Sequence, residues 1–176
     1  MSVNQPIFLR PGDYFFGRHD GPVTTLLGSC VSIILWHPRW RLLGVSHYVL
    51  PRDPTASYNQ APLNDQDTRY GDAVFQRMHA DMVRHGTNPS EYRKGIFGGG
   101  CLSRFEGNSL RKIGHTNSDF ARKQFSLRNW AVDLHDLNGE HYRRLQIDGL
   151  SGRIDCQRNE VTPPVMPNSR TGGHIL

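Results

Sequence analysis

Short runs of alternating hydrophobic and polar residues dominate the first fifty positions of the chain and predict β-strands. A turn and a short strand are expected at residues 11–18, followed by strands at 23–27 and 31–36. The last of these is rich in β-branched side chains, which pack well on a pleated surface. A further strand is expected at 41–50, where Leu43 and other apolar residues again alternate with small or polar ones.

The middle of the chain changes to helical spacing. Residues 51–70 are polar and contain three prolines, so they predict a long loop that can move. Apolar residues then recur at the spacing of one helix face over 72–85. A second helix is expected to be capped by Asn117 or Ser118 and to end at Asn129, where a left-handed residue fits.

Strands return in the last third. We expect a short strand at 95–97, another at 131–137, and a hairpin formed by 142–147 and 153–156. Strands therefore outnumber helices and do not alternate with them regularly. This pattern predicts an α+β fold, a layered β-sandwich or mixed and largely antiparallel sheet with two main helices.

Length and composition agree with one globular domain. A chain of 176 residues suits a single core, and we expect a domain at 1–158 and a flexible tail at 159–176. No apolar run approaches the roughly 20 residues that span a bilayer. The start of the chain lacks the basic and apolar regions of a secretory signal. We therefore expect a cytoplasmic monomer without membrane insertion.

The net charge and the cysteine content argue against several classes of function. The net charge is +5, but the basic residues are scattered in short groups, which favours a solvated surface over a nucleic-acid site. The three cysteines are far apart in the sequence, which argues against a disulfide framework and predicts reduced thiols. No CxxC, zinc-finger or HExxH spacing is present, so neither a metal nor another cofactor is expected.

The segment from residue 24 to residue 51 carries the candidate chemistry. Gly28-Ser29 predicts a tight turn that places Cys30 between two hydrophobic strands, with backbone N–H groups beside the sulfur. His47 lies in the next strand along the chain, which can return it to the side of Cys30. A thiol and an imidazole in contact can attack a carbonyl carbon and protonate a leaving amine. Residue types alone equally allow a buried structural cysteine and a hydrogen-bonded strand histidine.

Other positions are weaker candidates. Cys101 follows a glycine run and has His115 nearby in sequence, so it is the second candidate nucleophile, although a packed thiol is the more common case. Cys156 ends a predicted strand and is expected to be structural. The run Gly98–Gly100 lacks the lysine of a phosphate-binding loop, which argues against a nucleotide site.

The stretch TTLLGSCVSIILWHP…GVSHYVLP resembles the signature of the CheD family of chemoreceptor glutamine deamidases. The resemblance continues through Arg69-Tyr70-Gly71-Asp72, the glycine run, Ile113-Gly114 with Asn117, and Asp136 with Gly139, and so covers roughly residues 10–156. It implies a layered fold shared with the cytotoxic necrotizing factor deamidases. The pair His115-Thr116, the long loop near residues 56–67 and the tail depart from the family pattern.

The resemblance also implies an activity. By it, Cys30 is the nucleophile, His47 the base and acid, and Thr24 the residue that completes the site and orients His47. Backbone N–H groups near Gly28 and Ser29 would form an oxyanion hole. The implied substrates are glutamine side chains of methyl-accepting chemoreceptors, with methyl-ester hydrolysis as a related reaction. The alternative is a regulatory module that binds a CheC-type phosphatase with little catalysis.

Overall fold

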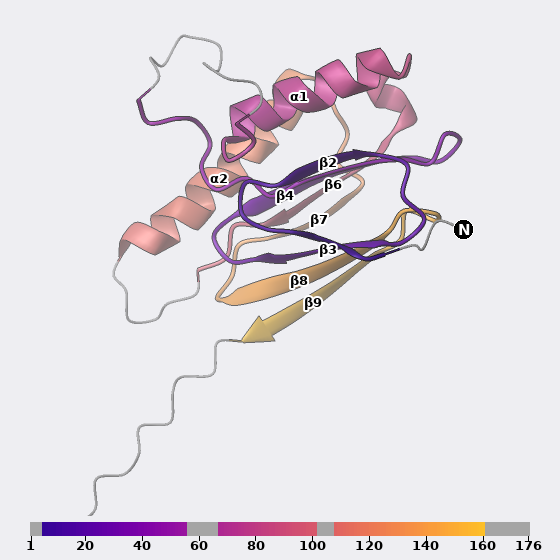
Figure 1. Ribbon diagram of the computed structural model, residues 1–176. Coiled ribbons are helices and arrows are strands. Elements are labelled where there is room, and N and C mark those ends of the chain that lie inside the picture. Colours follow the sequence, from indigo (N-terminus) through magenta and orange to yellow (C-terminus); the bar gives the residue numbers. More distant parts are fainter. Residues whose placement is uncertain (1–4, 56–66, 102–107, 161–176) are drawn as a thin grey trace, which may run out of the picture.

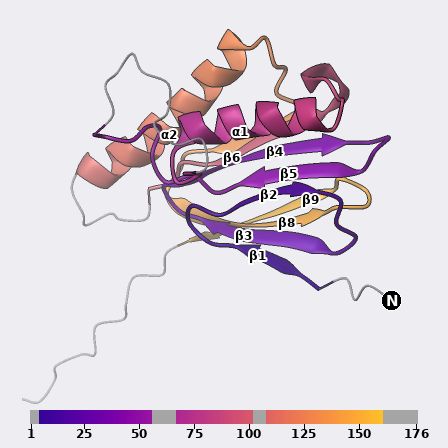
Figure 2. The same ribbon diagram turned by 45° about the horizontal axis from the view of Figure 1, so that its top comes forward.

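The computed structural model describes residues 5–55, 67–101 and 108–160, and these form three stacked layers. Two helices form the first layer, a five-stranded sheet the second, and a four-stranded sheet the third (Figures 1 and 2). The five-stranded sheet has the order β2 (Tyr14–Gly17), β5 (Leu42–Ser46), β4 (Val31–His37), β6 (Arg93–Gly98), β7 (Leu134–Leu137). The four-stranded sheet has the order β1 (Ile7–Leu9), β3 (Pro22–Leu27), β8 (His141–Asp148), β9 (Ile154–Glu160).

Most strand pairs are antiparallel. Only the pairs β1–β3 and β6–β7 are parallel among the described strands, so both sheets are mixed. The helices α1 (Gly71–Arg84) and α2 (Asn108–Leu127) lie on one face of the five-stranded sheet, and a short 3-10 turn, η1 (Pro89–Glu91), precedes β6. This arrangement confirms the predicted α+β class and layered sandwich. The relation to the cytotoxic necrotizing factor fold stays a prediction.

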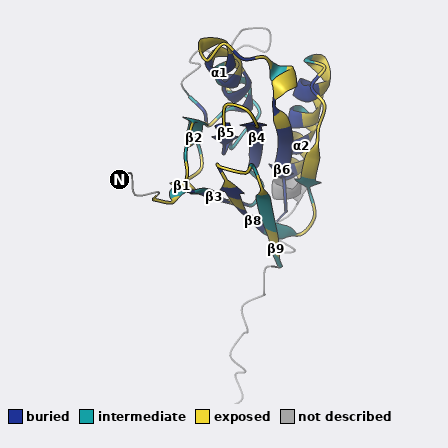
Figure 3. Ribbon diagram, turned by 90° about the vertical axis from the view of Figure 1, so that its right-hand side faces the viewer, coloured by how far each residue is buried: buried dark blue, intermediate teal, exposed yellow. Residues whose placement is uncertain are grey.

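Strand β4 is buried along its whole length because it lies in the middle layer (Figure 3). Its odd-numbered residues Val31, Ile33 and Leu35 face the helices, whereas Ile34 and Trp36 face the second sheet. This explains the continuous apolar run of β4, since a strand covered on both faces needs no polar alternation. The apolar core between the two sheets is formed by Leu9, Val23, Leu27, Ile34, Trp36, Leu43, Val45, Phe97, Leu145 and Ile147.

Helix α2 differs most from its expected form. It begins at Asn108, so Asn117 is a buried residue in its middle and not its cap. The sequence pattern missed the first turns because Gly114 and Thr116 are poor helix formers. Gly114 is needed there, since a Cβ at this position would approach the carbonyl oxygens of Gly99 and Gly100 to 2.5 and 2.7 Å.

The other helices and strands differ less from the bounds expected from the sequence. Strand β5 ends at Ser46, β7 begins at Leu134, and β1 was not anticipated because only three residues form it. The expected positive φ at Asn129 is present, at 52°. Strand β9 reaches Glu160, so it extends past the expected domain boundary at 158, and residues 161–176 lie outside the described part. The loop expected at 51–70 is described only at its two ends.

No helix within the described residues has both the length and the apolar character needed to cross a membrane.

Candidate active site

Cys30 and His47 lie on the same face of the five-stranded sheet. In the pairing of β4 with β5, Ile34 lies opposite Val45, and the same register continues to the bridge between Val31 and Tyr48. This register makes Cys30 and His47 diagonal neighbours, which are typically about 7–8 Å apart across an antiparallel pair. Both face the core between the sheets, since Cys30 packs against that core. The partly buried Cys30 and the buried His47 therefore lie near each other, next to the core between the two sheets.

Burial keeps both groups neutral. It raises the pKa of the Cys30 thiol to about 11, while a hydrogen bond from the backbone of Cys30 itself acts in the opposite direction. Burial also lowers the pKa of the His47 imidazole, against smaller opposing effects of the Leu9 carbonyl and the Asp13 carboxylate. Desolvation disfavours the charged form of either group. At neutral pH the site therefore holds a thiol and an uncharged imidazole.

Thr25 of β3 holds the ring of His47 across the gap between the sheets. Its Oγ1 lies 2.8 Å from Nδ1 of His47 and donates to the carbonyl oxygen of Leu9 at 2.9 Å. Because the hydroxyl proton is used on Leu9, the hydroxyl oxygen accepts the Nδ1 proton of His47. With this assignment of the protons, Nε2 is the unprotonated nitrogen.

The structure gives this contact to Thr25, and the expected role of Thr24 in completing the site stays a prediction. Successive side chains of a strand point to opposite faces. Thr25 is fully buried on the inner face. Thr24 points to the opposite face, the face of Leu26, and is also buried, with 8% of its surface exposed. Thr24 is paired with Phe8 of β1, which also faces outward and is 57% exposed.

Asn117 of α2 connects the segments that carry the two groups. Its Nδ2 donates to the carbonyl oxygens of Ser29 at 2.9 Å and of Val49 at 2.8 Å. These residues are neighbours of Cys30 and near neighbours of His47 in the sequence. Two carbonyl partners require the amide nitrogen at this position, so the orientation of the Asn117 side chain is defined. The hydroxyl of Tyr48 donates to the backbone carbonyl of Asn117 at 2.5 Å.

The glycine run 98–100 supports the turn that carries Cys30. The backbone N–H of Gly99 donates to the carbonyl of Cys30 at 2.9 Å, and that of Gly100 to the carbonyl of Gly28 at 2.8 Å. Gly98 has a φ of 119°, and a Cβ there would lie 2.2 Å from the carbonyl oxygen of Cys30. The run therefore serves close backbone packing. Gly28 and Ser29 are half-buried beside Cys30, and their expected part in an oxyanion hole stays a prediction.

The remaining candidates lie elsewhere. Cys101 is buried, with 8% of its surface exposed, and its backbone N–H donates to Gly139. Cys156 donates to a carboxylate oxygen of Asp136, and burial raises the pKa of its thiol to about 11. His115 is exposed on α2. Within the described residues, no cluster of three or more His, Cys, Asp or Glu side chains could hold a metal ion.

Sequence reasoning missed two residues that shape the site. The adjacent threonines 24 and 25 are both buried but lie on opposite faces of β3, and Thr25 shares the inner face with Val23 and Leu27. Asn117 was taken as a helix cap, and nothing in its local pattern shows that its amide reaches two distant carbonyls. The turn between β1 and β2 was expected within residues 11–18, but not its contact with the site, in which the backbone carbonyl of Asp13 accepts the backbone N–H of His47 at 3.0 Å.

The structure is an α+β sandwich in which Cys30 and His47 form a candidate site between the two sheets. A family model described as CheD chemotactic sensory transduction matches residues 49–158, more than half of the chain. The chain belongs to the CheD family, which confirms the resemblance seen in the sequence.

Several relatives match over most of their length. A probable chemoreceptor glutamine deamidase CheD 3 of Dechloromonas aromatica is 34% identical over 151 residues, covering 84% of each chain. A probable chemoreceptor glutamine deamidase CheD 2 of Albidiferax ferrireducens is 33% identical over 160 residues, covering 89% of this chain and 88% of the relative. A protein of the same name without a number, from Acidiphilium cryptum, is 35% identical over 159 residues, covering 87% and 80%.

Replacing Asn117 by alanine should loosen the two segments that it joins. The change leaves two carbonyls without their donor, and we expect the free energy of unfolding to fall by about 2–4 kcal/mol. Hydrogen exchange at the amides of Val31 and Tyr48 should speed up selectively, measured by mass spectrometry below the melting temperature. Gln124→Ala removes a similar amide two turns along the same helix and is the control. Unchanged exchange at Val31 and Tyr48 in Asn117→Ala would contradict this role.

Proposed function

We propose that this chain is a cysteine-dependent protein-glutamine deamidase that acts on methyl-accepting chemoreceptors. The observation that carries the proposal is the common face of Cys30 and His47, with the imidazole held by Thr25. The relatives are named probable chemoreceptor glutamine deamidases, which supports the substrate class. Cys30 is only partly buried, which is compatible with attack on a peptide side chain.

The hydrogen bond from His47 to Thr25 sets the direction of proton transfer. Because Nδ1 carries a proton, Nε2 is the nitrogen that takes the proton of the Cys30 thiol. The raised pKa of Cys30 and the lowered pKa of His47 both oppose a preformed ion pair. Proton transfer therefore accompanies attack on the substrate, and His47 acts as a general base.

The proposed reaction is acyl transfer through a thioester. The sulfur of Cys30 bonds to the amide carbon of a glutamine side chain while its proton moves to His47. The C–N bond then breaks, and ammonia leaves with that proton. A water molecule, deprotonated by His47, attacks the thioester carbon, the C–S bond breaks, and glutamate and the free thiol result. Backbone N–H groups near Ser29 and Cys30 would stabilise the oxyanion, a contribution of typically about 3 kcal/mol per donor.

The same chemistry extends to receptor methyl esters, because an ester is also an acyl donor to a thiolate. The proposed substrate places the protein in the cytoplasm. A CheC-type phosphatase would be a binding partner there, and a regulatory role without catalysis is the alternative function. The two functions make different demands on the thiol of Cys30, because binding alone does not need it.

Mass spectrometry of a chemoreceptor cytoplasmic fragment tests the proposed activity. Incubation with the wild-type protein should convert specific glutamines into glutamates, and Cys30→Ala should abolish the conversion because no nucleophile remains. Cys101→Ala and Cys156→Ala are matched controls and should retain the activity. Conversion that persists in Cys30→Ala, or that disappears in Cys101→Ala instead, would overturn the assignment of the nucleophile. Partner binding without any conversion would favour the regulatory alternative.

The two neighbouring threonines provide a second test. Thr25→Val keeps the shape of the side chain but removes the acceptor for Nδ1 of His47, so kcat should fall about 5- to 10-fold, the cost of one buried hydrogen bond of ~1 kcal/mol. Thr24→Val makes the same chemical change on the opposite face of β3, away from the imidazole of His47, and should leave kcat within about twofold. Steady-state ammonia release measures both variants. The reverse order of effects would support the role first expected for Thr24.

A further inference from the structure

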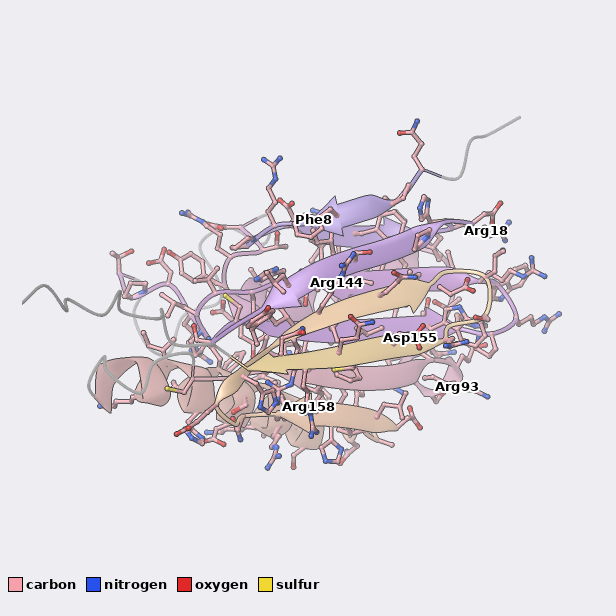
Figure 4. The ribbon with its side chains drawn as sticks, turned by 90° about the horizontal axis from the view of Figure 1, so that it is seen from below. Phe8, Arg18, Arg93, Arg144, Asp155 and Arg158 are labelled. Carbon is pink, nitrogen blue, oxygen red and sulfur yellow. The ribbon has the colours of Figure 1, made fainter. Side chains whose placement is uncertain are left out.

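The outer face of the four-stranded sheet is open in the part of the chain that the structure describes. None of the described helices covers it, and Figure 4 looks directly onto it. Strands β3 and β8 lie in its middle, and each is already paired on both sides. Their backbone groups are therefore occupied, and a partner on this face has to bind through side chains. A helix presents side chains in this way, whereas an added strand needs a free sheet edge.

Apolar side chains lie at the end of this face that is nearer to Cys30. Phe8 is 57% exposed and Leu26 47% exposed, although both are large apolar residues. Together with Tyr142 they line one side of a hollow on the sheet surface. Exposed apolar side chains gathered in one hollow are typical of a site that binds a protein partner.

Arg144 lies in the middle of the same face, opposite Leu26 in the pairing of β3 with β8 (Figure 4). It lines the hollow beside Phe8 and also the next hollow along the sheet, and Gln157 is shared between the two in the same way. No carboxylate of the described residues forms an ion pair with Arg144. The nearby Asp155 is paired with Arg153 at 2.8 Å. Within the described part of the chain, the face therefore combines an apolar patch with the guanidinium of Arg144 and is complementary to an apolar side chain next to a carboxylate.

This face is close to the candidate nucleophile. Leu26 precedes Cys30 by four residues, so the chain between them spans at most about 13 Å at ~3.3 Å per residue. A helix of about nine residues covers this distance at ~1.5 Å per residue. A helical segment that contacts Leu26 and Arg144 and continues past the end of β3 can bring a side chain two to three turns away to the end of the sandwich where Cys30 lies.

We propose that the hollow lined by Phe8, Leu26 and Arg144 is a docking site for an acidic, amphipathic helix of the protein substrate. This inference rests on the proposed deamidase function. The helix places apolar side chains against Phe8 and Leu26 and a carboxylate against Arg144. The docking site selects helical protein substrates over isolated glutamine side chains and takes no part in the chemical step.

Steady-state kinetics with two substrates tests the docking site. For a chemoreceptor cytoplasmic fragment, Leu26→Asn and Arg144→Gln should each raise KM about 5- to 10-fold with kcat unchanged, as expected for lost contacts outside the reacting centre. For a glutamine peptide shorter than two helical turns, kcat/KM should equal that of the wild type, because such a peptide cannot reach the hollow. Arg122→Gln, which removes an exposed charge from α2 on the other side of the molecule, is the control and should change neither substrate's kinetics.

The outcomes separate the docking site from the activity. If the wild-type protein deamidates neither substrate, the proposed deamidase function is wrong, and the docking site, which rests on it, is wrong as well. If the wild type is active and both variants keep the wild-type KM for the receptor fragment, the docking site is wrong and the activity stands. A change of sedimentation coefficient in Leu26→Asn with unchanged KM would show that this face binds a second copy of the chain, which also overturns the proposal.

Discussion

The pairing of β4 with β5 is the constraint on which the site depends. Both strands are covered on two sides, so their register is fixed by which side chains enter each core. A slip of one residue would exchange the faces of all side chains in one strand and would separate Cys30 from His47. The bridge between Val31 and Tyr48 continues this register beyond the regular strand, into the segments where the two groups lie. The hydrophobic cores thus determine the position of the chemistry.

Burial between two sheets has an electrostatic consequence. The same apolar surroundings that fix the positions of Cys30 and His47 favour their uncharged forms. Many thiol nucleophiles are activated by a nearby positive charge, but here His47 contacts the Thr25 hydroxyl, and the charged group that acts on it is the Asp13 carboxylate. His47 therefore acts as a base during attack, while Thr25 holds its ring and Asn117 joins the segments that carry Cys30 and His47.

The sequence predicted the parts of the fold that local patterns encode. Strands β3 and β4, helix α1 and the β8–β9 hairpin follow from apolar periodicity and turn residues. The family resemblance, carried by the GSC turn and His47, predicted the pair that the register brings to one face. The distinction between Thr24 and Thr25 depends on which face of β3 is inward, and the role of Asn117 depends on contacts with Ser29 and Val49, far away in the sequence. Such contacts have no local signal, so the sequence pattern could not provide them.

The pH dependence of alkylation at Cys30 tests most directly whether this thiol is both accessible and uncharged. The wild-type protein would be treated with iodoacetamide at increasing pH, with the modified residue identified by mass spectrometry and the fold monitored by circular dichroism. The account predicts labelling of Cys30 at a rate that keeps rising until the pH nears the thiol pKa of about 11. A rate that already levels off below neutral pH would reveal a preformed thiolate, and a complete lack of labelling would show a sealed sulfur; either result contradicts the account.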